Sequence, residues 1–187
     1  RPSSAQPRIA QTTSEPIMSD HLQQLRTWAT GLEGSVLAGR YDLIQLLGAG
    51  GMGAVFLGQH HRTRRRVAIK LLLPALLSDP KATKRFQYEA RAAASVSQRG
   101  VVEIIDFDQD PQNGPFIVME LLEGQSLRQL LLARGKLQPR EALELGLDVA
   151  GTLEAVHAAG IIHRDLKPSN IFLASEPGET TRVKVLD

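Results

Sequence analysis

The segment that most constrains this chain is "IIHRDLKPSNIFL", residues 161–173. Its polar residues lie between two short apolar runs: His163, Arg164, Asp165, Lys167 and Asn170. Apolar, strand-like residues on both sides predict a polar loop held by two buried strands. Five residue types at fixed offsets, each present at about one in twenty, arise by accident with a probability on the order of one in three million per position. The loop is therefore expected to carry chemistry.

Apolar runs of strand length begin at Tyr41 and are separated by glycine, arginine-rich or Asp-Pro-Gln-Asn-Gly turns. The predicted strands span residues 41–47, 54–58, 67–73, 101–107 and 116–121. A helix interrupts them, beginning at Asp79 and Pro80, a helix-capping residue followed by proline, and ending near residue 97. This order predicts a five-stranded, mainly antiparallel sheet with one helix.

After residue 122 the pattern becomes helical, with predicted helices at 126–133 and 139–159. The longer helix carries an apolar stripe of Ala142, Leu145, Val149, Leu153 and Val156. A short strand follows at 183–186, in which Lys184 is the polar partner of two valines. The fold class is α+β: a small sheet lobe over residues 36–122 and the start of a helical lobe over 123–187.

The first 35 residues precede these lobes. Residues 1–20, rich in Pro, Ser, Gln and Thr, predict a disordered leader. A short helix is expected from Asp20, with Leu22, Leu25, Ala29 and Leu32 on one stripe. Packing of this stripe on the following domain is favoured over a partner-binding role.

Two further features point to an anionic ligand. In "GAGGMGAV", Gly48, Gly50 and Gly53 would let backbone N–H groups approach a phosphate, although a plain glycine-rich turn has the same appearance. In "RVAIKLLL", Lys70 is expected to be mostly buried, so it either reaches solvent or meets a carboxylate and an anionic ligand. Glu89 lies on the inward stripe of the following helix and could supply that carboxylate, unless it pairs with Arg85 on the surface.

Composition excludes several functional classes. The formal net charge is only +2, and the one dense basic run, residues 62–66, is interpreted as a solvated turn in preference to a nucleic-acid patch. The absence of cysteine excludes disulfides and thiolate metal sites and agrees with a reducing compartment. No apolar stretch is long enough to span a membrane. We expect a cytoplasmic location, no membrane segment and no nucleic-acid partner.

"HRDLKPSN" resembles the catalytic loop of eukaryotic-type protein kinases, and the glycine-rich turn, Lys70 and Glu89 then follow in that family's order. The lysine after the aspartate is similar to that of the serine/threonine class. "GAGGMGAVF" and "IVMELLEGQSL" look most like bacterial members. The resemblance covers residues from about 41 to the last, and it implies a protein-kinase-like fold, ATP and Mg²⁺ as cofactors, and a protein Ser/Thr substrate.

The resemblance also implies a role for each site residue. Asp165 would accept or orient the proton of the substrate hydroxyl, Lys167 would steady the transferred phosphate, and Lys70, held by Glu89, would contact the α- and β-phosphates. Asn170 and Asp187 would hold magnesium. The nucleotide would lie against Leu47, Gly48, Ala49, Gly50, Gly51, Met52, Gly53, Val55, Ala68, Lys70, Met119, Glu120 and Leu122.

The resemblance also implies that Asp187, the last residue of "VKVLD", corresponds to the aspartate of the family's Asp-Phe-Gly motif. The chain is accordingly interpreted as an N-terminal fragment of a serine/threonine kinase. The alternative is a truncated, catalytically inactive ATP-binding or docking module. A nucleic-acid module using residues 62–66 is the least favoured alternative.

Overall fold

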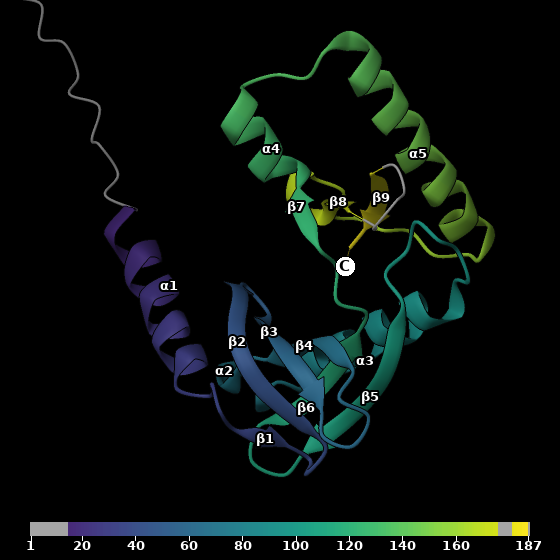
Figure 1. The fold of residues 1–187 in the computed structure, drawn as a ribbon. Coiled ribbons are helices and arrows are strands. Elements are labelled where there is room, and N and C mark those ends of the chain that lie inside the picture. Colours follow the sequence, from purple (N-terminus) through teal and green to yellow (C-terminus); the bar gives the residue numbers. More distant parts are fainter. Residues whose placement is uncertain (1–14, 176–180, 187) are drawn as a thin grey trace, which may run out of the picture.

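The computed structural model describes residues 15–175 and 181–186, which form two lobes with the sheet lobe below the helical lobe in Figure 1. The lower lobe contains α1 (Glu15–Thr30), β1 (Val36–Leu37), β2 (Tyr41–Gly50), β3 (Gly53–His60), β4 (Arg66–Leu72), α2 (Pro74–Leu77), α3 (Pro80–Ser95), β5 (Ile104–Asp110) and β6 (Gly114–Met119). The upper lobe contains β7 (Gly124–Ser126), α4 (Leu127–Arg134), α5 (Pro139–Ala158), the 3₁₀ turn η1 (Pro168–Asn170), β8 (Ile171–Ala174) and β9 (Arg182–Val185).

The lower sheet is antiparallel throughout, in the order β1-β2-β3-β4-β6-β5. The protein-kinase-like α+β fold predicted from the sequence is confirmed, but the sheet has six strands where five were expected. The additional strand, β1, pairs with the start of β2 through a tight turn in which Ala38 has φ of 46° and Gly39 has φ of 65°. Two residues are too few to show strand periodicity, so this pairing leaves no recognisable pattern.

Alternate strand residues point to opposite faces of the sheet, and each face packs against one helix. Ile69 and Phe116 lie on the face whose core includes Ala29 of α1. Leu72 and Ile117 lie on the other face, against α3. The sheet is therefore enclosed between α1 and α3, which Figure 1 shows on different sides of it.

α3 begins where its sequence predicts. The side chain of Asp79 accepts a hydrogen bond from the backbone N–H of Lys81 at 2.9 Å, and Pro80 occupies the first helical position, where its missing N–H costs nothing. Phe86 and Ala90 are buried against the sheet. This packing fixes the rotation of α3 and thereby the direction of Glu89.

α1 corrects one expectation and confirms another. It begins at Glu15, so residues 15–20, predicted as disordered, are helical, whereas residues 1–14 lie outside the described part. The predicted stripe does pack on the following domain: Leu25 and Ala29 are buried, and Leu32 packs against the same core.

In the upper lobe, the predicted stripe of α5 faces inward. Val149 belongs to the core formed with α4, β8 and β9, and Leu145 and Leu153 pack against that core. Ala142, the first residue of the predicted stripe, is exposed, and the large exposed apolar residues of α5 are Leu143 and Leu147, on its other side. The predicted stripe is thus largely covered by α4 and the short sheet of the upper lobe.

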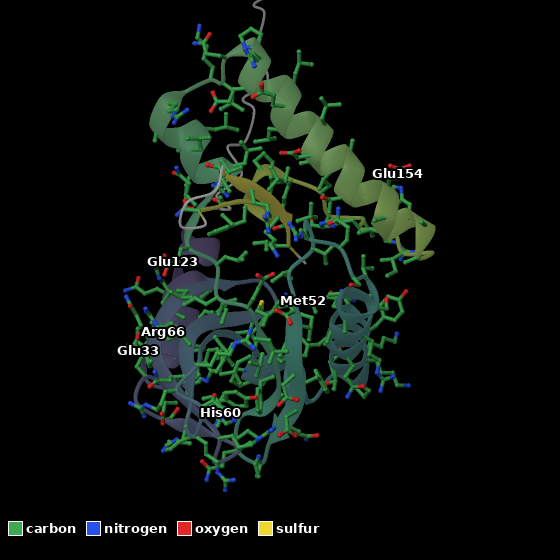
Figure 2. The ribbon with its side chains drawn as sticks, turned by 45° about the vertical axis from the view of Figure 1, so that its right-hand side comes forward. Glu33, Met52, His60, Arg66, Glu123 and Glu154 are labelled. Atoms are coloured by element: carbon green, nitrogen blue, oxygen red, sulfur yellow. The ribbon has the colours of Figure 1, made fainter. Side chains whose placement is uncertain are left out.

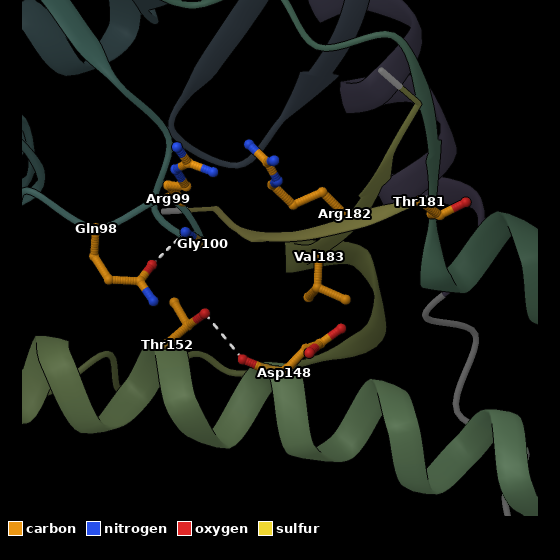
Figure 3. A pocket seen from close by; sticks show the side chains of 8 residues that line it. All are labelled: Gln98, Arg99, Gly100, Asp148, Thr152, Thr181, Arg182 and Val183. Carbon is orange, nitrogen blue, oxygen red and sulfur yellow. Dashed lines mark hydrogen bonds between the residues drawn. The ribbon is translucent and has the colours of Figure 1, made fainter. Parts of the chain in front are cut away.

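The lobes meet at the loop after α3 (Figure 3). Gly100 accepts a hydrogen bond from the N–H of Val185 at 2.7 Å, which joins this loop to β9. A Cβ on Gly100 would lie 2.0 Å from Oγ1 of Thr152 in α5, so the contact tolerates no side chain without rearrangement. The cavity beside this contact is lined by Gln98, Arg99, Gly100, Asp148, Thr152, Thr181, Arg182 and Val183, none of which was predicted as a site residue.

Candidate active site

The lower face of the site is built on β3, β4 and β6. Val55 pairs with Lys70, and Ala68 pairs with Met119, so the antiparallel register turns all four side chains to one face. This is the face that packs on α3. The structure thus brings together four of the residues predicted to surround the nucleotide, from the consecutive strands β3 and β4 and from the more distant β6.

Lys70 and Glu89 approach each other across this face. The Lys70 side chain is 12% exposed, and its Nζ lies 3.9 Å from Oε2 of Glu89, whose side chain is 31% exposed. Of the two pairings left open by the sequence, the structure has Glu89 facing Lys70. An ammonium in this setting is stabilised by a nearby carboxylate, and a bound anion could approach the same nitrogen.

The glycine-rich segment is the hairpin between β2 and β3, where Gly50 pairs with Gly53. A Cβ on Gly53 would lie 2.1 Å from the carbonyl oxygen of Leu71, so the fold itself requires glycine there. A Cβ on Gly48, Gly50 or Gly51 would meet no described atom within 4 Å. The fold gives no steric reason for glycine at these three positions, which leaves room for a ligand at the hairpin.

The segment after β6 connects the lobes and contains Glu120 and Leu122. The backbone N–H of Glu120 donates to the carbonyl of Glu103 at 3.0 Å, and its carboxylate accepts from the N–H of Glu103 at 2.8 Å. The same carboxylate bonds to Nζ of Lys184 in β9. The segment predicted to bind adenine is therefore held from both lobes.

Lys184 was not predicted as part of this arrangement. The alternation of β9 marks Lys184 as a polar partner of the valines, yet it is only 6% exposed, and Nζ also donates to the carbonyl of Val101 at 3.2 Å. The partners lie 64 and 83 residues away along the chain. The one available signal was the placement of a lysine in a strand that is otherwise apolar.

The upper side of the site is the loop before β8. Nζ of Lys167 lies 2.6 Å from Oδ2 of Asp165, and Nδ2 of Asn170 donates to the carbonyl oxygen and to Oδ2 of Asp165 at 3.0 and 3.1 Å. Asp165 and Lys167 are exposed, whereas Asn170 is buried in η1. Lys167 and Asn170 thus converge on the carboxylate of Asp165, which is open to a substrate.

These contacts set the charge of Asp165. The hydrogen bond from Lys167 is the main reason that the pKa of the Asp165 carboxyl is lowered from its ordinary value, and the charge of Lys167 and the Asn170 amide act in the same direction. Asp165 is therefore ionised at neutral pH and acts as a hydrogen-bond acceptor.

The start of this loop differs from the prediction. β8 follows the polar loop as expected, but residues 161–167 form no strand, and Ile162 is 66% exposed. Arg164 has φ of 63°, a left-handed conformation that interrupts extended backbone. Nε2 of His163 is buried without a hydrogen-bond partner in the described part of the chain. The first of the two predicted strands does not form, because the apolar pattern does not encode the backbone conformation of this segment.

Asn170 offers the chemistry expected of a magnesium ligand. Its Nδ2 is engaged by Asp165, so the amide oxygen remains as a hard donor of the type Mg²⁺ prefers. Asp187, the other predicted ligand, lies outside the described residues. No cluster of three His, Cys, Asp or Glu side chains suited to a metal occurs within the described ranges.

Among the helices described, none combines the length and apolar character needed to cross a membrane.

The chain is similar to known proteins over most of its length. Residues 41–187 match the protein kinase domain family. The chain is 38% identical to the serine/threonine-protein kinase PknA of Mycobacterium tuberculosis over 158 residues, covering 82% of this chain and 36% of that protein. It is 41% identical to the serine/threonine-protein kinase Pkn1 of Myxococcus xanthus over 155 residues, covering 81% and 22%.

The fold agrees with a solved structure as well. The crystal structure of the Mycobacterium tuberculosis PknI kinase domain superposes with a TM-score of 0.70 at 32% identity, covering 83% of this chain and 61% of that one. The chain thus spans about a third or less of the length of the curated relatives it matches. With its match to the family over residues 41–187, this chain belongs to the protein kinase domain family.

Proposed function

We propose that this chain carries the nucleotide site and the phosphoryl-transfer loop of a serine/threonine protein kinase. The reaction would transfer the γ-phosphate of ATP to Ser or Thr hydroxyls of a protein substrate. The observation that carries the proposal is the convergence of Lys167 and Asn170 on the ionised carboxylate of Asp165, in a chain where Lys70 faces Glu89. Phosphoryl transfer requires this kind of alignment and charge neutralisation and little covalent work by the protein.

The nucleotide would bind on the sheet face and its phosphates under the glycine hairpin. Val55, Ala68 and Met119 share the sheet face on which adenine would pack, with Leu47 at the edge and the backbone of Glu120 and Leu122 as hydrogen-bonding groups. Leucine, valine and methionine provide apolar contacts to a flat ring. Ala49, Met52 and the glycines would surround the phosphates, where the space left at Gly48, Gly50 and Gly51 supports close backbone approach.

Each polar residue then has one task. Lys70, oriented by Glu89, would contact the α- and β-phosphates. Asp165 would orient the substrate hydroxyl and receive its proton as the bond to phosphorus forms, while Lys167 would neutralise charge on the transferred phosphate. Asn170 and Asp187 would hold Mg²⁺, which when bound neutralises phosphate charge. We propose a cytoplasmic location, where ATP is available.

The test is Asp165→Asn in the full-length protein that carries this chain. The amide cannot accept the hydroxyl proton, so we expect transfer to a Ser/Thr protein substrate to fall by at least roughly a thousandfold. MgATP affinity should stay within about twofold, because Asp165 is not assigned to nucleotide binding. Glu154→Gln, on the exposed side of α5, is the matched control.

Turnover that is unchanged in Asp165→Asn would contradict the assigned role. A wild-type protein that binds MgATP but transfers no phosphate to any protein would instead support the inactive binding-module alternative.

A further inference from the structure

The segment that follows α1 is hydrogen-bonded along the outer edge of β2. The N–H of Gly34 donates to the carbonyl of Leu43 at 2.7 Å, and the N–H of Leu43 donates to the carbonyl of Ser35 at 2.9 Å. Further along, the N–H of Leu46 donates to Oε1 of Glu33 at 2.7 Å. In this last bond the acceptor is a side chain, and the donor, Leu46, immediately precedes Leu47, which is predicted to contact the nucleotide.

The hydrogen bond from Leu46 occurs where β2 is irregular. The pairing of β2 with β3 shifts register between Leu43 and Gln45 and again between Leu46 and Gly48. Such irregularities weaken the regular ladder and bend the strand. A carboxylate that accepts the Leu46 N–H therefore fixes the backbone where β2 leads into the glycine hairpin.

α1 supports the same part of β2 through packing. Ala29 is fully buried in the core of the sheet, and Trp28 and Leu32 pack against that core. Leu46 and Ala49 pack against the same core, and Ala49 lies between two glycines of the hairpin. α1 and the start of the hairpin thus pack against one shared core, on the sheet face opposite α3.

We propose that Trp28, Ala29, Leu32 and Glu33 form an N-terminal brace that sets the position of the glycine hairpin over the nucleotide phosphates. In this brace Glu33 is a positioning residue. The inference rests on the proposed ATP site. It adds a determinant outside residues 41–187, the part of the chain that matches the family.

The place of Glu33 along β2 supports an effect on the glycine hairpin and not on the whole sheet. Met52, at the tip of the hairpin, lies at the end of the sheet that faces the other lobe, whereas His60 lies at the opposite end (Figure 2). Glu33 bonds to β2 between these ends, close to the hairpin. Loosening β2 there would disturb the contacts of the hairpin with a triphosphate and leave the adenine-binding segment after β6 in place.

The experiment compares MgATP with adenosine, which lacks phosphates, using full-length wild-type protein and Glu33→Ala in calorimetric titrations. Glu33→Ala should weaken MgATP binding by roughly threefold to tenfold, the range expected for one typical hydrogen bond at an exposed position. Adenosine affinity should fall less than MgATP affinity, because Leu47 is the only one of the proposed adenine contacts that adjoins Leu46. Glu33→Gln, which keeps an acceptor oxygen, should restore most of the MgATP affinity, and Gln24→Ala, on the exposed side of α1, should behave as wild type.

The outcomes separate the two proposals. A wild-type protein that does not bind MgATP would refute the ATP site itself. Wild-type MgATP affinity in Glu33→Ala, or an equal loss for MgATP and adenosine, would refute the brace and leave the ATP site standing.

A measurement without substitutions covers the case in which Glu33→Ala fails to fold. Trp28 is the only tryptophan among these 187 residues and belongs to the brace. Titration of the 187-residue chain with MgATP should change its tryptophan fluorescence, and adenosine should not. An unchanged spectrum at saturating MgATP would contradict coupling between the brace and the phosphates.

Discussion

Asp110, at the end of β5, is a buried carboxylate that joins two parts of the lower lobe. Oδ2 accepts from the N–H of Ala38 at 2.8 Å, and Oδ1 accepts from the N–H groups of Gln112 and Asn113 at 3.0 and 2.8 Å. Burial alone would raise the pKa of Asp110, but the hydrogen bonds from these three backbone groups outweigh burial and lower it. The charged carboxylate therefore stabilises the turn that contains Ala38, which has positive φ.

Replacement of Asp110 by Asn should destabilise the protein at pH 7 by about 2 kcal/mol, because one end of the amide would present a donor to another donor. The pKa of Asp110 is lower in the folded state than in the unfolded state. Its contribution is therefore complete above about pH 4, the ordinary aspartate pKa, and is lost as the pH falls through the folded value. The stability gap between wild type and Asp110→Asn should narrow below about pH 4.

Urea unfolding of both proteins between pH 7 and pH 3 measures this gap. Other carboxylates titrate in the same range, so the difference between the two proteins is the relevant quantity. Glu154→Gln removes an exposed carboxylate and should follow the wild-type profile. A gap that stays constant with pH would show that Asp110 is not stabilised as an anion.

At the scale of elements, the β2–β3 hairpin contains one glycine that the fold requires, Gly53, and one that it does not, Gly50. Gly53 stands against the backbone of β4, where a Cβ would overlap the carbonyl oxygen of Leu71. Backbone cannot rotate away as a side chain can. Gly50 pairs with Gly53 across the hairpin but faces open space.

Gly53→Ala should therefore reduce the free energy of unfolding by about 1–3 kcal/mol, the usual range for overpacking, whereas Gly50→Ala should change it by less than about 0.5 kcal/mol. MgATP affinity should fall in Gly50→Ala despite its native stability, since the added methyl group would occupy space proposed for phosphates. Urea unfolding and calorimetric titration measure the two effects. Equal stability of the two variants would contradict the steric argument.

Elements with a clear period could be predicted from the sequence to within a few residues. β3 and β4 follow the apolar runs at 54–58 and 67–73, and α3 follows its Asp-Pro cap. β1 could not be predicted, because its pairing depends on the conformation of Ala38 and Gly39 and not on periodicity. The Lys70–Glu89 approach was foreseeable from the inward stripe of α3, whereas the bond from Glu33 to β2 depends on tertiary placement that no local pattern encodes.

At the scale of the whole molecule, the two lobes are joined through a buried lysine. Lys184 comes from β9 of the upper lobe, Glu120 belongs to the connecting segment, and Val101 follows the loop after α3. The polar loop of Asp165 precedes β8, which pairs with β9. The sheet face proposed to bind the nucleotide and the loop that contains Asp165 are therefore both connected to Lys184. The alignment proposed for catalysis depends on this residue.

Lys184→Met should destabilise the protein by about 3 kcal/mol, because it keeps the volume of the stem but leaves the Glu120 carboxylate without its partner. The double variant Lys184→Met/Glu120→Gln should recover part of that loss, since the amide carries no charge and still accepts from the N–H of Glu103. Urea unfolding of wild type, both single variants and the double variant measures the coupling. If the two effects simply add, the ion pair does not join the lobes. If the double variant is more stable than Lys184→Met alone, the unpaired charge caused the loss.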